Sequence, residues 1–166
     1  DRIANFLDPD TPFLEISPLA AYDSAYPIGG GAVAGIGIVG GTEVVIFAND
    51  PTVLAGAMHA YSTKKWTRAM EIARDNRLPY VQFVESAGGD LRMGGKGSRG
   101  KSAPPIMGGH FAESGRTFYE ITELSKLRIP TISIVFGSST AGGAYQPGMS
   151  DYNIFIKKQS KVFLGG

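Results

Sequence analysis

Two pairs of consecutive glycines, each placed just after a strand-like run, constrain this chain more than any other feature. YVQFVE at residues 80–85 leads into SAGGDL at 86–91, and TISIVF at 131–136 leads through GSS into TAGGAY at 140–145. Glycine allows positive φ and close approach of the backbone to another group. Because strand, glycine turn and helix-like segment recur, the sequence predicts a layered α/β domain.

Each glycine turn is expected to lead from a strand into a helix. The first N–H groups of a helix lack internal partners and can hold an oxyanion, and glycine lets a reacting carbonyl come within hydrogen-bond reach. The simpler interpretation is that the glycines only allow a helix to pack closely on a strand. Two such pairs at equivalent places favour the anion-binding interpretation.

The remaining elements follow from periodicity and turn residues. We expect a short helix at 2–7, a hairpin at 32–48 that turns at residues 40–42, and a helix that begins at Ser62 and buries Trp66. Further expected elements are strands at 80–84, 131–136, 151–156 and 162–164, and a helix at 112–126. The polar, glycine-rich stretch up to residue 109 is predicted to be a long functional or mobile loop.

Composition excludes several kinds of site. The formal net charge of +1 provides no global field for nucleic acid or an anionic membrane, and the absence of cysteine excludes disulfides and thiolate chemistry. No apolar stretch approaches the ~20 residues that span a bilayer, so we expect a soluble chain. It stops at FLGG directly after a strand-like run, which suggests a fragment.

The motifs resemble a known family. SAGGDL followed by TAGGAY resembles the paired oxyanion segments of the crotonase superfamily. GSSTAGGAYQPGMSDY, with FLGG, VVIFANDPTV and STKKWTRAMEIA, is similar to the carboxyltransferase β subunits of biotin-dependent acyl-CoA carboxylases, and the resemblance runs from residue 2 to 166. It implies a crotonase/ClpP-like layered α/β domain of repeated β-β-α units. Residues 1–166 would be an incomplete N-terminal domain, with the second domain absent.

The resemblance also implies a reaction. Carboxybiotin on a separate carrier chain releases CO2, the biotin anion removes the proton α to the thioester of an acyl-CoA, and the enolate attacks CO2. Because biotin is the base, the protein supplies only N–H donors, which the resemblance assigns to Gly142 and Gly143. The resemblance places Ala141 and Ala144 on either side of these donors, as residues that bind the acyl-CoA. It implies no metal in this domain.

Other positions are candidates for binding coenzyme A. The resemblance assigns Ser86, Ala87, Gly88 and Gly89 to the adenine and pantetheine end. Lys64 and Lys65, with Arg68, form a compact positive cluster that suits the nucleotide phosphates, although a solvated helix face explains it equally simply. Lys96, Arg99 and Lys101 admit the same two interpretations.

The implied partners are acyl-CoA and a biotin carboxylase and biotin carboxyl carrier subunit. The full-length protein would form a homohexamer in the cytoplasm, or in the mitochondrial matrix of a eukaryote, without binding nucleic acid or membrane.

Four alternatives stay open. An enoyl-CoA hydratase would need a pair of glutamates, but Glu113, Glu120 and Glu123 lie on a helix that is expected to be structural. A serine protease would use Ser138 or Ser139, but no histidine follows them in this chain. A biotin-dependent decarboxylase or transcarboxylase shares the same residues, and this chain alone could bind acyl-CoA without turning it over. His59 and His110 fit no recognisable catalytic arrangement.

Overall fold

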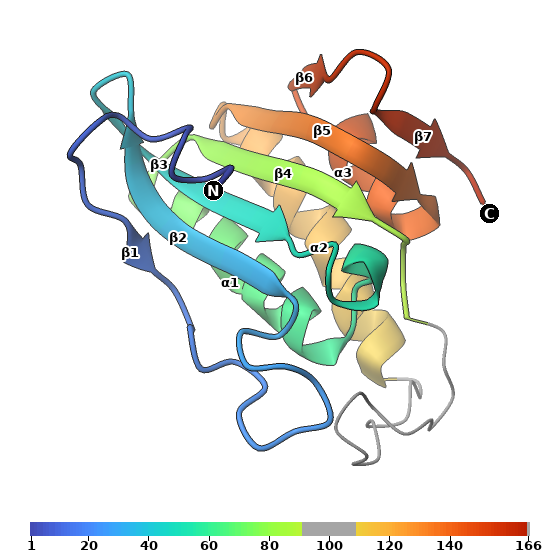
Figure 1. Cartoon of the computed structure of the whole chain (residues 1–166). Helices are drawn as coiled ribbons and strands as arrows, with labels where there is room; N and C mark the ends of the chain where they lie inside the picture. Colours follow the sequence, from blue (N-terminus) through green and yellow to red (C-terminus); the bar gives the residue numbers. More distant parts are fainter. Residues whose placement is uncertain (91–108, 166) are drawn as a thin grey trace.

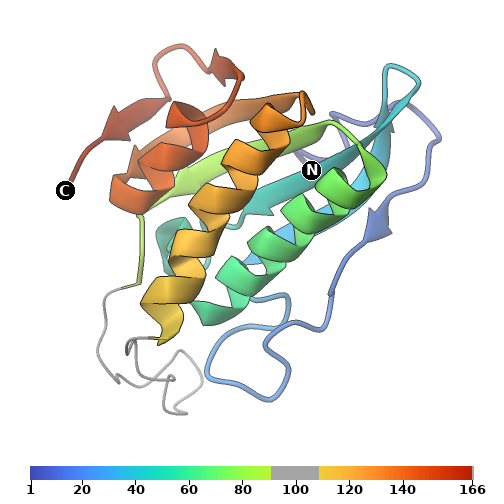
Figure 2. The ribbon, with the colours of Figure 1, turned by 180° about the vertical axis from the view of Figure 1, so that it is seen from behind.

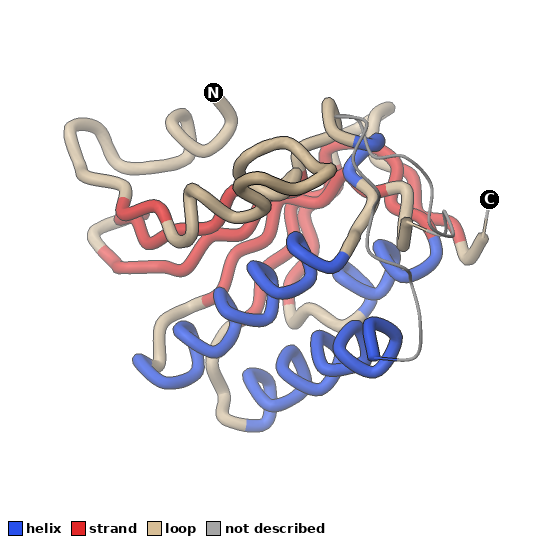
Figure 3. The backbone as a smooth tube through the Cα atoms, turned by 90° about the horizontal axis from the view of Figure 1, so that it is seen from below, coloured by secondary structure: helices blue, strands red, loops and turns tan. Residues whose placement is uncertain are grey.

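A single twisted sheet forms the centre of the computed structural model, which describes residues 1–90 and 109–165 (Figure 1). Its strands lie in the order β1-β2-β3-β4-β5-β6, and β7 also pairs with β5. The helices cover one face of the sheet, and the N-terminal segment crosses the other (Figures 2 and 3). The predicted α/β class is confirmed.

The first part of the sheet is antiparallel. Strand β1 (Leu14–Glu15) pairs with β2 (Ala32–Val39), which forms a hairpin with β3 (Thr42–Asn49) as predicted. The Asp8 carboxylate accepts hydrogen bonds of 2.7 Å from both N–H groups of the hairpin turn, those of Gly40 and Gly41.

The helix predicted at residues 2–7 was wrong. This segment forms turns, in which the N–H groups of Asn5 and Leu7 donate to the carbonyl oxygens of Asp1 and Ile3. Its apolar side chains, Ile3, Phe6 and Leu7, pack on the open face of the sheet. The helix-like spacing of these residues therefore reflects burial against the sheet and not a continuous helix.

Helix α1 (Ala60–Asn76) begins three residues earlier than predicted with Ser62 as its N-cap. His59 is the N-cap, and its N–H donates to the hydroxyl of Ser62, which lies at the third helical position, over 2.8 Å. Trp66 is in the core, as predicted: it is 4% exposed and stacks on Phe47 with ring centroids 5.9 Å apart.

The rest of the sheet is parallel. Strands β3, β4 and β5 run side by side in one direction, so their carboxyl ends lie at the same edge (Figure 1). The elements of this half are η1 (Leu54–Gly56), β4 (Tyr80–Ser86), α2 (Gly109–Lys126), β5 (Thr131–Thr140), η2 (Ala141–Ala144), α3 (Tyr145–Gly148), β6 (Tyr152–Phe155) and β7 (Lys161–Phe163). Ligands of open α/β sheets bind outside such an edge.

Two apolar layers hold the sheet. Between the sheet and the helices, Phe47, Met70 and Leu124 are each fully buried. On the other face, Ile46, Val81 and Phe83 pack against the N-terminal segment. The central strands are therefore covered on both faces, as expected for parallel strands, although Gln82, Thr131 and Ser133 are buried polar residues within them.

Candidate active site at the carboxyl ends of the central strands

The two glycine turns meet at the carboxyl ends of β4 and β5. A Cβ added to Gly143 would lie 2.8 Å from the Ser86 hydroxyl oxygen, and one added to Gly88 would lie 2.8 Å from the Thr140 carbonyl oxygen. Real Cβ atoms almost never come that close to such atoms. Glycine at these two positions therefore brings together segments that are more than fifty residues apart.

The second turn is a short 3-10 helix. Thr140 is its N-cap, and Ala141 has a φ of 47°. In regular 3-10 bonding the third residue donates the first internal bond, so the N–H groups of Ala141 and Gly142 are the ones left without a partner inside the turn. A Cβ added to Gly142 would meet no atom within 4 Å, so the space above this residue is open.

The first glycine turn differs from the prediction. Residues 87–90 run beside residues 55–58 and do not begin a helix: the Ala87 N–H donates to the Ala55 carbonyl, and the Asp90 N–H donates to the carbonyl of Met58, over 3.0 and 2.7 Å. Met58 in turn donates to the Gly88 carbonyl. No helix follows within the described part of this segment, so the predicted helix N-terminus at SAGGDL was wrong for residues 86–90, and Leu91 lies outside the described residues.

Strand β4 carries a polar anchor that the sequence analysis missed. The Gln82 side-chain amide is fully buried, and its two N–H groups are shared among the Ser133 hydroxyl (2.8 Å), the Gln146 backbone carbonyl (2.9 Å) and the Ser150 hydroxyl (3.0 Å). These contacts tie α3, which directly follows η2, to the two central strands. The only signal was one polar residue inside the apolar run YVQFV.

The positive cluster on α1 divides into two kinds of residue. The Lys65 side chain is 1% exposed, and its ammonium group donates to the carbonyls of Ala32 (2.8 Å) and Gly29 (3.3 Å). Burial lowers the Lys65 pKa, and Glu15, 3.7 Å away, only partly opposes this. The predicted role of Lys65 in phosphate binding therefore conflicts with its position, whereas Lys64 and Arg68 are exposed.

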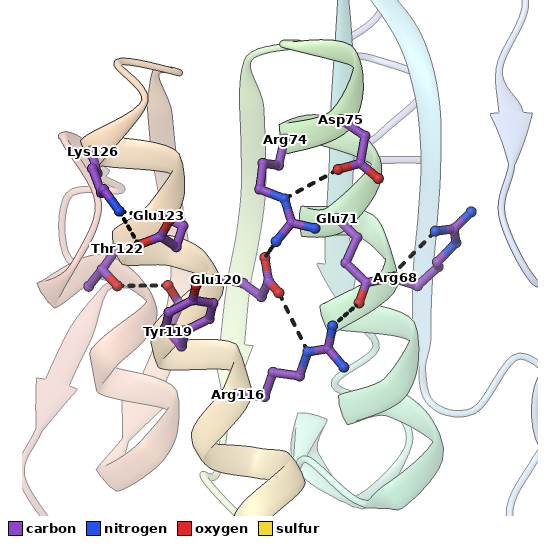
Figure 4. Close-up of polar contacts among 10 residues, drawn as sticks. All are labelled: Arg68, Glu71, Arg74, Asp75, Arg116, Tyr119, Glu120, Thr122, Glu123 and Lys126. Carbon is purple, nitrogen blue, oxygen red and sulfur yellow. Dashed lines mark hydrogen bonds and ion pairs between the residues drawn. The ribbon is translucent and has the colours of Figure 1, made fainter.

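The candidate glutamates of a hydratase take part in helix contacts. Glu120 is 1% exposed and accepts from Arg74 (2.5 Å) and Arg116 (3.5 Å), while Glu123 pairs with Lys126 (Figure 4). Partial burial alone would lower the Arg74 pKa, but Glu120 and a neighbouring aspartate outweigh it and raise the pKa above its ordinary value. These contacts support a structural role for both glutamates.

The serine candidates also have structural surroundings. Ser139 is fully buried and its hydroxyl donates to the Gly143 carbonyl over 2.8 Å, whereas Ser138 is exposed. His59 is buried and stacks on Tyr26 with ring centroids 3.8 Å apart. Neither arrangement resembles a nucleophile next to its base.

Some predicted residues lie outside the described part of the chain: Lys96, Arg99, Lys101 and the side chains of His110 and Glu113. Among the residues that the structure describes, no group of three or more His, Asp or Glu side chains could hold a metal ion. No described helix is long and apolar enough to cross a membrane.

Comparison with known proteins gives consistent matches. A family model described as the carboxyl transferase domain matches residues 1–166. The chain is 49% identical over 166 residues to a Mycobacterium tuberculosis protein named as a probable biotin-dependent acyl-coenzyme A carboxylase beta2 subunit, covering 100% of this chain and 29% of that protein. It is 42% identical over 169 residues to the biotin-dependent 3-methylcrotonyl-coenzyme A carboxylase beta1 subunit of the same organism, covering 100% and 30%.

Among solved structures, the β subunit of geranyl-CoA carboxylase from P. aeruginosa matches with a TM-score of 0.84 and 39% sequence identity. The match covers 99% of this chain and 29% of that subunit. The chain thus spans less than a third of the length of these relatives.

Proposed function

Because the chain belongs to the carboxyl transferase domain family, we propose that it forms the acyl-CoA-binding part of a carboxyltransferase. This membership confirms the resemblance to the carboxyltransferase β subunits that the sequence indicated. The proposed reaction transfers a carboxyl group from carboxybiotin to the α-carbon of an acyl-CoA. The proposal concerns the whole protein, of which the relatives' lengths suggest this chain is one part.

One observation carries the proposal: the turn with Gly142 and Gly143 lies at the carboxyl edge of the central strands and leaves open space above Gly142. A thioester oxygen in that space would meet backbone N–H donors and no side chain. Removing one such donor from an enzyme costs roughly 3 kcal/mol of transition-state stabilisation. The resemblance assigned a donor to both Gly142 and Gly143, but regular 3-10 bonding would use the Gly143 N–H inside the turn. In this proposal Gly142 presents the donor, and Gly143 lets the turn pack against Ser86.

Biotin, carried by another chain, would supply the carboxyl group and then the base for the α-proton. The residues of this chain would bind and orient the thioester and stabilise the enolate oxygen. None of the described residues is proposed to hold biotin itself; that site would be completed by a second domain of a partner subunit. This division is consistent with the structural roles of Glu120, Ser139 and His59.

The coenzyme A end would lie along the first glycine turn. Ser86, Ala87, Gly88 and Gly89 are proposed to contact the pantetheine and adenine, with Ala141 and Ala144 at the acyl end. Ala87 and Gly89 are exposed, and a Cβ on Gly89 would meet no atom within 4 Å. Lys64 is the remaining lysine candidate for a phosphate contact.

The partners follow from the same proposal. They are an acyl-CoA, a biotin carboxylase with its biotin carrier, and further copies of the protein in a homohexamer. Under this proposal the protein works in the cytoplasm, or in the mitochondrial matrix of a eukaryote.

The substitution Gly142→Ala tests the proposal, because its methyl group would enter the space reserved for the thioester oxygen without striking the protein. Carboxyl transfer from a carboxylated biotin carrier to acyl-CoA is measured with the whole protein that carries this chain. We expect kcat to fall about 100-fold, the scale of one lost oxyanion contact. Gly148→Ala also places a methyl group in open space, four residues beyond η2, and should leave kcat unchanged. Equal rates for the two variants would refute the oxyanion role, and no transfer by the unmodified protein would refute the function.

A further inference from the structure

A hollow of about 310 Å³ is lined by side chains of helices α1 and α2. Five of its lining residues belong to α1, and one, Arg116, belongs to α2. The six residues are Thr63, Lys64, Thr67, Arg68, Glu71 and Arg116. Because residues four apart share a helix face, the two threonines form one row along α1, and Lys64 and Arg68 form the next.

The hollow is positively charged. It contains three cationic side chains and one carboxylate, that of Glu71, so its formal charge is +3 − 1 = +2. Glu71 lies between the two arginines and accepts from Arg116 over 2.5 Å and from Arg68 over 3.4 Å (Figure 4). Among the described residues Lys64 has no acidic partner, so its charge is uncompensated.

The arginines keep donors available. A guanidinium group has five N–H donors. Arg116 directs one nitrogen at Glu71 and another at Glu120, and Arg68 directs one at Glu71, so both groups have further N–H donors. The shared Glu71 carboxylate fixes the two arginines in position and leaves part of their hydrogen-bonding capacity for a ligand.

The threonines provide an independent observation. Thr63 is 6% exposed and Thr67 is 8% exposed, and both line the hollow. Each hydroxyl can donate a hydrogen bond to an acceptor oxygen of a ligand placed in the hollow.

We propose that this hollow binds a phosphate group, held by the Lys64 ammonium, the free N–H groups of Arg68 and Arg116, and the hydroxyls of Thr63 and Thr67. Several positive donors around one small space match the acceptor oxygens of a phosphate, and hydrogen bonds between charged groups are the strong ones. The phosphate would belong either to the nucleotide end of coenzyme A, which rests on the proposed function, or to a free phosphate compound.

Calorimetric titration of the whole protein that carries this chain with inorganic pyrophosphate tests the site directly. Lys64→Gln is expected to raise the Kd about tenfold, the effect of one lost charge-assisted hydrogen bond. Thr67→Val, which keeps the shape of the side chain and removes its hydroxyl, should also weaken binding without lowering the melting temperature. Lys157→Gln removes the same charge at an exposed position outside the hollow and serves as the matched control. No binding, or equal weakening by Lys64→Gln and Lys157→Gln, would overturn the proposal.

A competition experiment then identifies the source of the phosphate. Displacement of pyrophosphate by coenzyme A, and less effectively by 3′-dephospho-coenzyme A, would support the hollow as a nucleotide subsite. Binding of pyrophosphate without displacement by coenzyme A would support a site for a free phosphate compound. Neither measurement depends on carboxyl transfer, so failure of the proposed reaction and failure of this site are separate results.

Discussion

Gly88 and Thr140 touch across the two central strands: a Cβ on Gly88 would lie 2.8 Å from the Thr140 carbonyl oxygen. Gly88 also has a φ of 90°, which side chains rarely tolerate. The contact is made where β4 and β5 end as parallel neighbours, so it sets the spacing between the first glycine turn and η2. The second glycines of the two motifs lie in different surroundings: Gly143 packs on Ser86, and Gly89 is exposed.

Gly88→Ala should therefore destabilise the fold. The unfavourable φ alone costs about 1–2 kcal/mol, and the contact with Thr140 adds to that cost. The matched control is Gly89→Ala, since Gly89 has neither a positive φ nor an atom within 4 Å of an added Cβ. Urea denaturation measures both variants. If they unfold at the same urea concentration, the close contact does not constrain the turn.

Lys65→Met should lower the free energy of unfolding by about 1–3 kcal/mol, because buried carbonyl oxygens would lose their donor. The carbonyls belong to Gly29 and Ala32, which lead into β2. Lys64→Met removes an exposed neighbour and should change stability little. Chemical denaturation separates the two, and equal stability of the variants would show that Lys65 is not an anchor.

The sequence predicted strands β2 to β5 well, because they are apolar runs bounded by glycine or proline, whereas β1 (Leu14–Glu15) was not predicted. The run TISIVF, for example, predicted a strand buried on both faces, and it forms the first part of β5. The prediction was poorer where contacts with distant residues decide the conformation of a segment. Residues 2–7 have a helical spacing but lie as turns on the sheet, because burial of Ile3 and Phe6 decides their conformation.

The candidate site was predicted only in part, for a similar reason. The glycine pairs indicated that the two motifs matter, but the pairing of residues 87–90 with Met58 is a long-range contact that local sequence does not show. Lys64 and Lys65 are adjacent and chemically alike, yet their directions on α1 expose one and bury the other. Gln82 depends on three acceptors from other segments, which no local pattern reveals.

Asp151 should make stability depend on acid pH. Partial burial alone would raise its pKa, but hydrogen bonds from the Thr131 N–H (2.9 Å) and hydroxyl (2.8 Å) and from Ser125 outweigh it and hold the pKa below the ordinary value of 3.8. A depressed carboxyl pKa contributes stability that is present above the unfolded-state pKa and is lost as pH falls through the folded-state pKa. Asp151→Asn should remove this contribution, so its unfolding free energy should fall less steeply below about pH 4. If the unfolding free energies of the two proteins fall equally steeply below about pH 4, Asp151 does not make this contribution.

Two buried glutamines offer a pair of identical substitutions with opposite expected effects. Gln146 is fully buried, and within the described chain neither atom of its side-chain amide has a hydrogen-bond partner. An unsatisfied buried polar group costs about 1–3 kcal/mol, so Gln146→Met, which keeps a flexible side chain of similar length, should raise the free energy of unfolding by a similar amount.

Gln82 is buried to the same extent, but its side-chain amide donates to the hydroxyls of Ser133 and Ser150 and to the backbone carbonyl of Gln146. Gln82→Met would leave these acceptors without that donor and should lower the free energy of unfolding by about 1–3 kcal/mol. It should also loosen α3, and with it η2, so the proposed carboxyl transfer should slow even where the protein remains folded. Urea denaturation of both variants gives the comparison. If Gln146→Met destabilises the protein as much as Gln82→Met does, then the Gln146 amide has a bonding partner, such as an ordered water, and helps to hold the turn.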